Sequence, residues 1–447
     1  MKKDMTVGNP TKVLLLFAIP MLIGNVLQNI NVSFKSIIVG QNVGINELGA
    51  IGATNGLNFL FMSMVIGLSI GVSVIVSQFF GSKDEDGIKK SVGTGVALIS
   101  IISMIMGILG IIFTRPLIEV LQTPENLIEP AHQYLQVMFL GMLPLGIFHG
   151  VASILRAFGD AKSPLYLQII GSLVGLFLIW LFVIQLQMGV RGAAIGTVTG
   201  QVLGAIMLLV YALKKNEYFD MSIFKLKLDR SIAKTMLKLG LPASIQFTLL
   251  SFGNMLIQVI INGFGYDVVT AYTVALAICM IAYAPSFALG SAVSTFAGQN
   301  KGANQIDRIR KGTWSGVKIV FVISVTITII VQIFARELLH LFMDQNYSHI
   351  VDIGVGYLRI ISIFYSVIGM MFIFRETLRG IGDAITPMVM GTIDIVVRVG
   401  AAFILSRSFG YTGVWWASPI AWMVSLTIGV TIFLRGKWET KNILKKG

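Results

Sequence analysis

The chain has 447 residues, of which 55% are hydrophobic and only 12% are charged. This composition excludes a soluble globular protein, because there is too little polar surface to coat a globule of this size. The net charge of +13 would suggest nucleic acid as the partner of a soluble protein. Apolar runs of about 20 residues, enough to cross roughly 30 Å of hydrocarbon, recur along the chain. We therefore predict an all-α polytopic membrane protein whose partner is the lipid bilayer and not nucleic acid.

We expect twelve transmembrane helices, taken here in chain order. A short amphipathic helix at 117–121, after the third span, is expected to lie in the membrane interface. The expected spans are 11–40, 48–80, one ending near 113, one ending near 156, 164–186, 192–213, 232–263, 270–298, one ending near 334, 350–374, 385–405 and one opening near 413.

The sequence is a duplication. Leu155-Arg-Ala-Phe-Gly-Asp-Ala-Lys-Ser-Pro164 returns as Leu378-Arg-Gly-Ile-Gly-Asp-Ala-Ile-Thr-Pro387, and further landmarks repeat at separations of about 221 to 223 residues. Each copy indicates a loop that turns on Gly-Asp and reopens into a helix at Pro. We predict two homologous six-helix lobes related by an axis along the membrane normal, at 1–213 and 231–447, joined by a cytoplasmic linker at 214–230.

The basic residues indicate the topology. Most Lys and Arg fall at helix ends that alternate counting places on one side, while the other side carries only Arg115, Arg191, Arg336 and Arg407. The positive-inside rule then places both termini in the cytoplasm. The single Cys279 excludes a disulfide framework within the chain.

Polar residues within the expected spans are the candidate substrate- or ion-binding groups. Gln28, Asn31 and Lys35 follow i, i+3, i+7 spacing and share one face of the first helix, which must meet protein or a wet cavity. An alternative is that such amides only join helices by hydrogen bonds. Further candidates of this kind are Asn58, Thr197, Gln201, Gln246, Asn254, Gln258 and Tyr272.

Asp394 and Arg398 lie well inside the eleventh span. Their i, i+4 spacing predicts an ion pair, which lowers the cost of holding two charges in a membrane. The pair can be purely structural, or it can hold a charge at depth and release it when the lobe moves.

No enzyme signature is found. The four histidines show no metal-binding spacing, and neither a phosphate-binding loop nor a nucleophile elbow is present. We therefore expect no catalytic residues, no metal site and no cofactor.

The chain resembles the multidrug and toxic compound extrusion (MATE) transporters, and is most similar to their bacterial DinF-like branch. The resemblance rests on the duplicated loop, Ser36-Ile-Ile-Val-Gly40, Gly298-Gln-Asn300 and Gly413-Val-Trp-Trp416. It implies two lobes in a V around a central cavity, and a monomer in the bacterial inner membrane. It also implies that rocking of the lobes exports organic cations or other amphipathic compounds by antiport with H⁺ or Na⁺.

The chain departs from this family at one position. A helix-one Asp that serves the cation site in the family is Lys35 here. The ammonium could imitate a permanently bound cation, or it could snorkel to the outer surface. Two other functions are weighed against export. A lipid-linked precursor flippase needs several cavity cations for pyrophosphate, and only Lys35 and Arg398 are available, whereas a non-transporting membrane sensor is compatible with the sequence.

Overall fold

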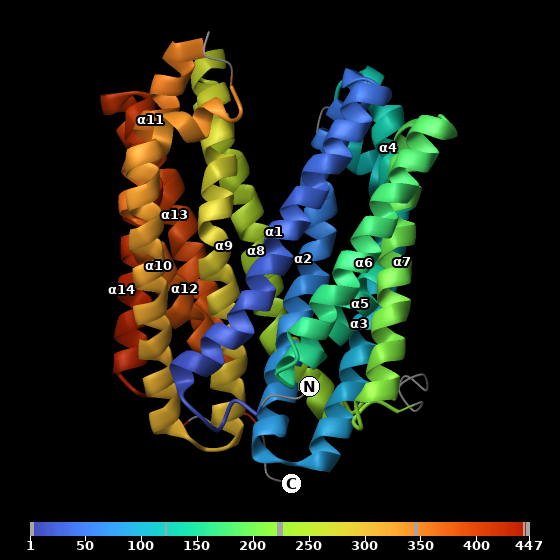
Figure 1. The fold of residues 1–447 in the computed structure, drawn as a ribbon, viewed down its shortest axis with the longest axis vertical. Helices are drawn as coiled ribbons and strands as arrows, with labels where there is room; N and C mark the ends of the chain where they lie inside the picture. The colour runs from blue at the N-terminus through green and yellow to red at the C-terminus, as the bar shows by residue number, and fades with distance from the viewer. Residues whose placement is uncertain (1–3, 121–122, 221–226, 344–346, 441–442, 444–447) are drawn as a thin grey trace. The chain divides into compact units, whose positions relative to one another are not determined.

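The structure is a computed structural model that describes residues 4–120, 123–220, 227–343, 347–440 and 443. Throughout these ranges the regular structure is helical, as predicted (Figure 1). The elements are α1 (Pro10–Asn42), α2 (Ile45–Ser82), α3 (Glu85–Val120), α4 (Glu125–Leu140), α5 (Met142–Ala157), α6 (Lys162–Trp180), the π-helix η1 (Leu181–Gln185), α7 (Gly189–Lys215), α8 (Arg230–Asn262), α9 (Tyr266–Gly302), α10 (Ile306–His340), α11 (Ser348–Ile363), α12 (Tyr365–Gly380), α13 (Ile385–Phe409) and α14 (Tyr411–Leu434).

Twelve membrane spans fit these helices. Ten stretches are each long and apolar enough to cross a bilayer, and two bent helix pairs, α4–α5 and α11–α12, each make one more. The bends of 47° and 48° fall at corresponding places of the two sequence copies. The predicted count of twelve spans is therefore reached when each of the two bent helix pairs is taken as one span.

The expected interfacial helix at 117–121 is wrong over its described residues. Residues 117–120 are the last turn of α3, which runs through Pro116. Ile118 is almost fully buried, so packing holds this turn on the helix despite the hydrogen bond that a proline forfeits. Residue 121 lies outside the described residues.

The chain divides into two compact units. Unit 1 comprises residues 1–4 and 23–247, and unit 2 comprises residues 5–22 and 248–447. Helices α1 and α8 each begin in one unit and end in the other, because the boundaries at 22/23 and 247/248 fall inside them. The lobes expected from the sequence, 1–213 and 231–447, instead leave α1 undivided and begin the second lobe at the start of α8. This division remains a prediction.

The duplicated loop has two hydrogen bonds in common between the units. Gly159 and Gly382 have φ of 82° and 91°, a left-handed conformation that ends a helix readily only at glycine. Asp160 then accepts bonds from the backbone N–H and the hydroxyl of Ser163, at 3.0 and 2.7 Å. Asp383 accepts the same two bonds from Thr386, at 3.1 and 2.7 Å. Each loop thus caps the start of the helix that follows it.

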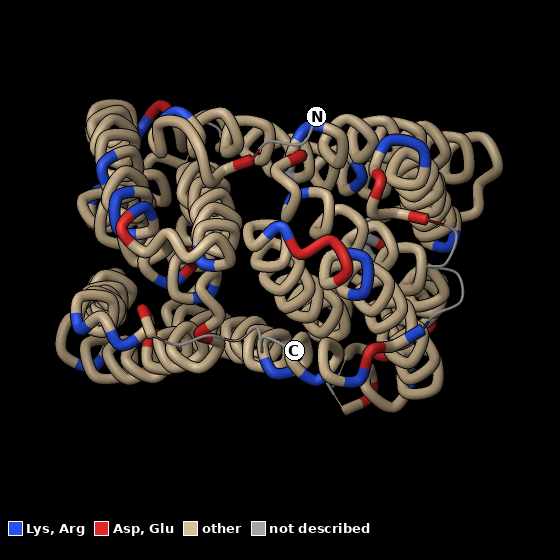
Figure 2. The backbone as a smooth tube through the Cα atoms, turned by 90° about the horizontal axis from the view of Figure 1, so that it is seen from below, with Lys and Arg blue, Asp and Glu red and all other residues tan. Residues whose placement is uncertain are grey.

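Charged residues gather at the helix ends. Viewed along the helices, the loops carry Lys and Arg beside Asp and Glu, whereas most helical turns are uncharged (Figure 2). Lys35, Asp394 and Arg398 are among the exceptions, and they belong to the candidate site.

Candidate functional site

The middle of α13 carries the predicted ion pair. Arg398 Nη2 donates to Asp394 Oδ2 across one helical turn, and Arg398 Nη1 donates to Asn254 Oδ1 on α8 at 3.3 Å. The side chain of Asp394 is 5% exposed and that of Arg398 is 16% exposed, while Asn254 is open. The cation is therefore the more accessible member of the pair.

Aromatic side chains from three other helices of unit 2 pack against one another. Tyr272 of α9 stacks on Trp415 of α14, with ring centroids 5.8 Å apart and planes within 4°. Tyr357 of α11 meets both rings edge-on, at 5.3 and 4.8 Å. Arg398 lies within electrostatic range of Tyr272 and Tyr357. Trp415 Nε1 is buried without a hydrogen-bond partner among the described residues.

A second charge cluster lies on α12. Glu376 pairs with Arg379, and its Oε1 lies 3.7 Å from Arg375 Nε. The Arg375 guanidinium packs 4.2 Å from the ring centre of Phe372. Arg375 also lies within electrostatic range of Asp394 and Arg398 on α13. Three arginines therefore share two carboxylates in this part of unit 2.

In unit 1, Lys35 turns toward the protein. Its Nζ donates to the hydroxyl of Tyr134 on α4 at 2.9 Å and lies 5.6 Å from the centre of that ring. Tyr134 is 2% exposed within an apolar cluster that includes Val39 and Met138. Asn31, one turn earlier, donates from Nδ2 to the carbonyl of Ser172 on α6 at 3.2 Å. The ammonium of Lys35 therefore has a hydrogen-bond partner inside unit 1, which snorkelling to the outer surface does not require.

The remaining predicted residues are dispersed. Thr197 bonds only the carbonyl of Ala193 in its own helix, at 2.7 Å, and Gln258 bonds Asn262 one turn on, at 2.8 Å. Gln246 is buried in the part of α8 that belongs to unit 1. The others lie on separate helices with partial or full exposure: Gln28 on α1, Asn58 on α2 and Gln201 on α7.

Several residues of these clusters were not predicted as site residues, among them Tyr134, Tyr357, Trp415, Arg375, Glu376 and Arg379. Tyr134 and Tyr357 are paired landmarks of the duplication, a signal that could have drawn attention to them. In the sequence, the adjacent Trp415 and Trp416 favour an interface belt at the opening of the last span, but Trp415 is 1% exposed against 43% for Trp416. That expectation is wrong for Trp415, because its face of α14 packs on Tyr272.

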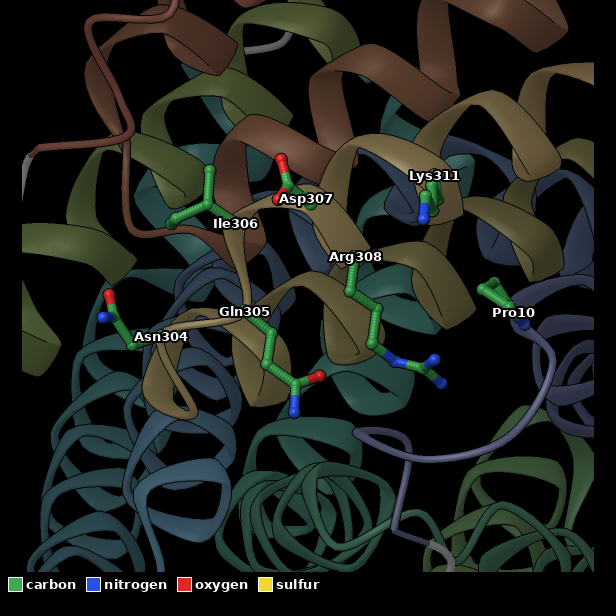
Figure 3. Close-up of a pocket in the computed structure, with 7 residues that line it drawn as sticks. All are labelled: Pro10, Asn304, Gln305, Ile306, Asp307, Arg308 and Lys311. Carbon is green, nitrogen blue, oxygen red and sulfur yellow. The ribbon is translucent and has the colours of Figure 1, made fainter.

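An open pocket of about 550 Å³ in unit 2 lies away from these clusters, at the start of α10 (Figure 3). There Arg308 reaches the segment that leads into Pro10 and donates to the carbonyls of Met5, Val7 and Gly8. Its lining includes none of the predicted site residues. Within the described ranges, no three His, Cys, Asp or Glu residues are grouped as a metal would require.

Comparison with known proteins places this geometry in a family. The MatE family profile matches residues 20–181 and 242–404, one stretch in each sequence copy. A probable multidrug resistance protein YpnP of Bacillus subtilis is 30% identical over 98% of both chains. The probable multidrug resistance protein YoeA of the same organism is 29% identical over 96% of this chain and 94% of its own.

The fold is matched by solved structures as well. A crystal structure of a protein named MATE, in complex with MaD5, superposes with a TM-score of 0.90 over 99% of both chains, at 23% identity. At that identity, the likeness concerns the fold alone.

Proposed function

This chain belongs to the MatE family, and we propose that it is a secondary active exporter of organic cations or other amphipathic small molecules. Membership makes it a membrane transporter and not an enzyme. The observation that carries the proposal is the family match in both sequence copies, together with relatives named as multidrug resistance proteins. The candidate binding residues Asp394, Arg398, Asn254 and Tyr272 support it, because charges inside membrane spans mark substrate and ion pathways.

We propose that inward movement of H⁺ or Na⁺ drives export, and that rocking of the two lobes around a central cavity carries the substrate across. We further propose a monomer in the bacterial inner membrane with both termini in the cytoplasm. In a variant without the buried Cys279, a cysteine at Asn42 or Tyr266 should react with an impermeant probe only from outside. Reaction only from the cytoplasm would show the opposite topology.

Transport assays test the function. Purified protein in proteoliposomes should move fluorescent amphipathic compounds when an H⁺ or Na⁺ gradient is imposed, and protein-free liposomes should not. Failure of both gradients to drive any compound of a broad panel, with protein that is folded and inserted, would contradict secondary active export.

The residue at position 35 bears on which ion is coupled to export. We propose that unit 1 lacks a Na⁺ site, because a monovalent cation needs oxygen ligands and an ammonium repels it. The bond from Lys35 to Tyr134 supports this proposal. Lys35→Asp should therefore create Na⁺ or H⁺ sensitivity in substrate release, while Lys35→Ala should not. Na⁺ binding by the wild type that is lost on mutating Gln28 and Asn31 would contradict it.

A further inference from the structure

The embedded charges of unit 2 are unequal in sign. Each carboxylate is already matched: Asp394 by Arg398, and Glu376 by Arg379. Arg375 approaches the same Glu376, so the cluster carries one positive charge in excess. Both carboxylates of the cluster therefore already face a guanidinium.

The more exposed side chain of the ion pair is also the positively charged one. Asp394 is 5% exposed, whereas Arg398 is 16% exposed and lies beside the open amide of Asn254. Arg398 uses Nη1 and Nη2 in its bonds to these two residues, while Nε is buried with no partner among the described residues. A guanidinium has five N–H donors in a planar fork suited to carboxylate and phosphate-like oxygens. Of the two charged side chains, the guanidinium is therefore the more exposed.

Arg398 lies within electrostatic range of a cluster of aromatic rings. Tyr272 is the partly exposed ring of this cluster; it stacks on Trp415, and Tyr357 contacts both rings edge-on. Stacked rings offer an apolar wall for a flat, apolar body. Trp415 Nε1 and Asp394 Oδ1 are buried and have no hydrogen-bond partner among the described residues. A charged end and an aromatic wall together suit an amphipathic molecule.

We propose that Arg398 and Asn254 form the anion-binding end of a substrate subsite in unit 2, with Tyr272 as its aromatic wall. The substrates are then amphipathic compounds that carry a carboxylate, sulfonate or phosphate-type group, and not simple organic cations. This inference rests on the proposed transport function and narrows its substrate class. Asp394 is a positioning residue here, because it restrains Arg398 and competes with the anion for it.

Binding of two matched probes to the purified full-length protein tests the subsite. The probes are an aryl sulfonate and an aryl trimethylammonium with the same ring system, measured by calorimetry. The wild type should bind the sulfonate at least about tenfold more tightly, and Arg398→Gln should weaken it by about 10- to 100-fold, as loss of a charge-assisted hydrogen bond implies. Asp394→Asn should strengthen sulfonate binding several-fold because it releases Arg398.

Controls separate these effects from damage to the fold. Arg407→Gln removes an exposed arginine of the same helix that packs on Phe403, and it should change neither affinity. If Arg398→Gln does not fold because Asp394 is left unpaired, the neutral pair Asp394→Asn/Arg398→Gln replaces it and should also bind the sulfonate weakly.

Three outcomes would overturn the proposal. The first is tighter binding of the trimethylammonium probe by the wild type, and the second is unchanged sulfonate affinity in both Arg398 variants. The third is displacement of the sulfonate by a polyprenyl phosphate in preference to soluble aryl anions, which would assign the site to a lipid. If sulfonate binding persists but no compound is transported in vesicles, the proposed export is wrong and the subsite stands. If only cations are transported, export stands and the anion-binding subsite is wrong.

Discussion

The two units share the loop that joins their fourth and fifth spans but differ in the helix that follows. At the separation of 223 residues that relates Arg156 to Arg379, Gly171 and Gly175 of α6 correspond to Asp394 and Arg398 of α13. In unit 1 these glycines let α6 approach the backbone of α7 closely. In unit 2 the same positions hold an ion pair.

The difference between α6 and α13 shows which positions of a duplicated membrane protein can change in one copy alone. The loop must end one helix and cap the next in both copies, so its residues are constrained by backbone geometry. A position inside a span is constrained by the helix that packs against it, and it can hold either a glycine in close backbone contact or a charge with a counter-ion. The glycine leaves no side chain for binding, whereas the ion pair supplies groups that can bind a solute.

The largest expected effect is that of breaking the ion pair. Arg398→Ala leaves Asp394 buried and uncompensated, which should lower the free energy of unfolding by about 3–5 kcal/mol. Unfolding by SDS in mixed micelles measures this change, and Arg407→Ala is the control. The double variant Asp394→Asn/Arg398→Ala should recover most of the loss; a double variant as unstable as the single one would contradict a charge-based cause.

Adding a methyl group at the glycine contact of unit 1 should destabilise the protein less than breaking the ion pair does. A methyl group at Gly171 would lie 2.9 Å from the carbonyl oxygen of Gly200, so Gly171→Ala should destabilise by about 1–3 kcal/mol through overpacking. Gly93 in α3 has open space around it, and Gly93→Ala should stabilise by about 0.5–1 kcal/mol. Equal effects at the two positions would show that α6 and α7 are not held by this contact.

The two loop caps should respond alike. Asp160→Ala and Asp383→Ala should each cost about 1 kcal/mol in the unfolding assay, as expected for a helix cap. Each carboxylate accepts one further bond at 3.2 Å, Asp160 from the hydroxyl of Tyr211 and Asp383 from the backbone N–H of Ile385, so the two costs should be similar. A loss confined to one of the two loops would contradict the equivalence of the copies.

The smallest effect concerns Lys35. Tyr134→Phe should cost about 0.5–1.5 kcal/mol, since it removes the acceptor of one hydrogen bond. In a double-mutant cycle with Lys35→Met, the two losses should not add. Additive losses would show that the bond does not contribute to stability.

The fold was predictable from the sequence because its signals are local. Span-length apolar runs, the repeated Gly-Asp loop and the i, i+4 spacing of Asp394 and Arg398 each act within a few residues. The bends at Gly141 and Phe364 were not predicted, since no proline falls at either break.

The site was predictable only in part. Tyr134 meets Lys35 from another helix, 99 residues away, and no periodicity specifies such a pairing. Trp415 and Trp416 are adjacent and chemically identical, so only the packing of α14 decides which of them is buried. Long-range packing, and not composition, therefore selects the partners of each charge.

The most direct test compares the rates at which proteoliposomes transport the matched aryl sulfonate and aryl trimethylammonium under the same driving gradient. The wild type should favour the sulfonate, and Arg398→Gln should lower the ratio of the two rates by about tenfold, the effect of roughly 1.4 kcal/mol. Lys35→Gln, which removes the embedded cation of unit 1, should change the ratio less. A wild-type preference for the cation, or a ratio that depends on Lys35 and not on Arg398, would contradict the assignment of substrate binding to the charged positions of unit 2.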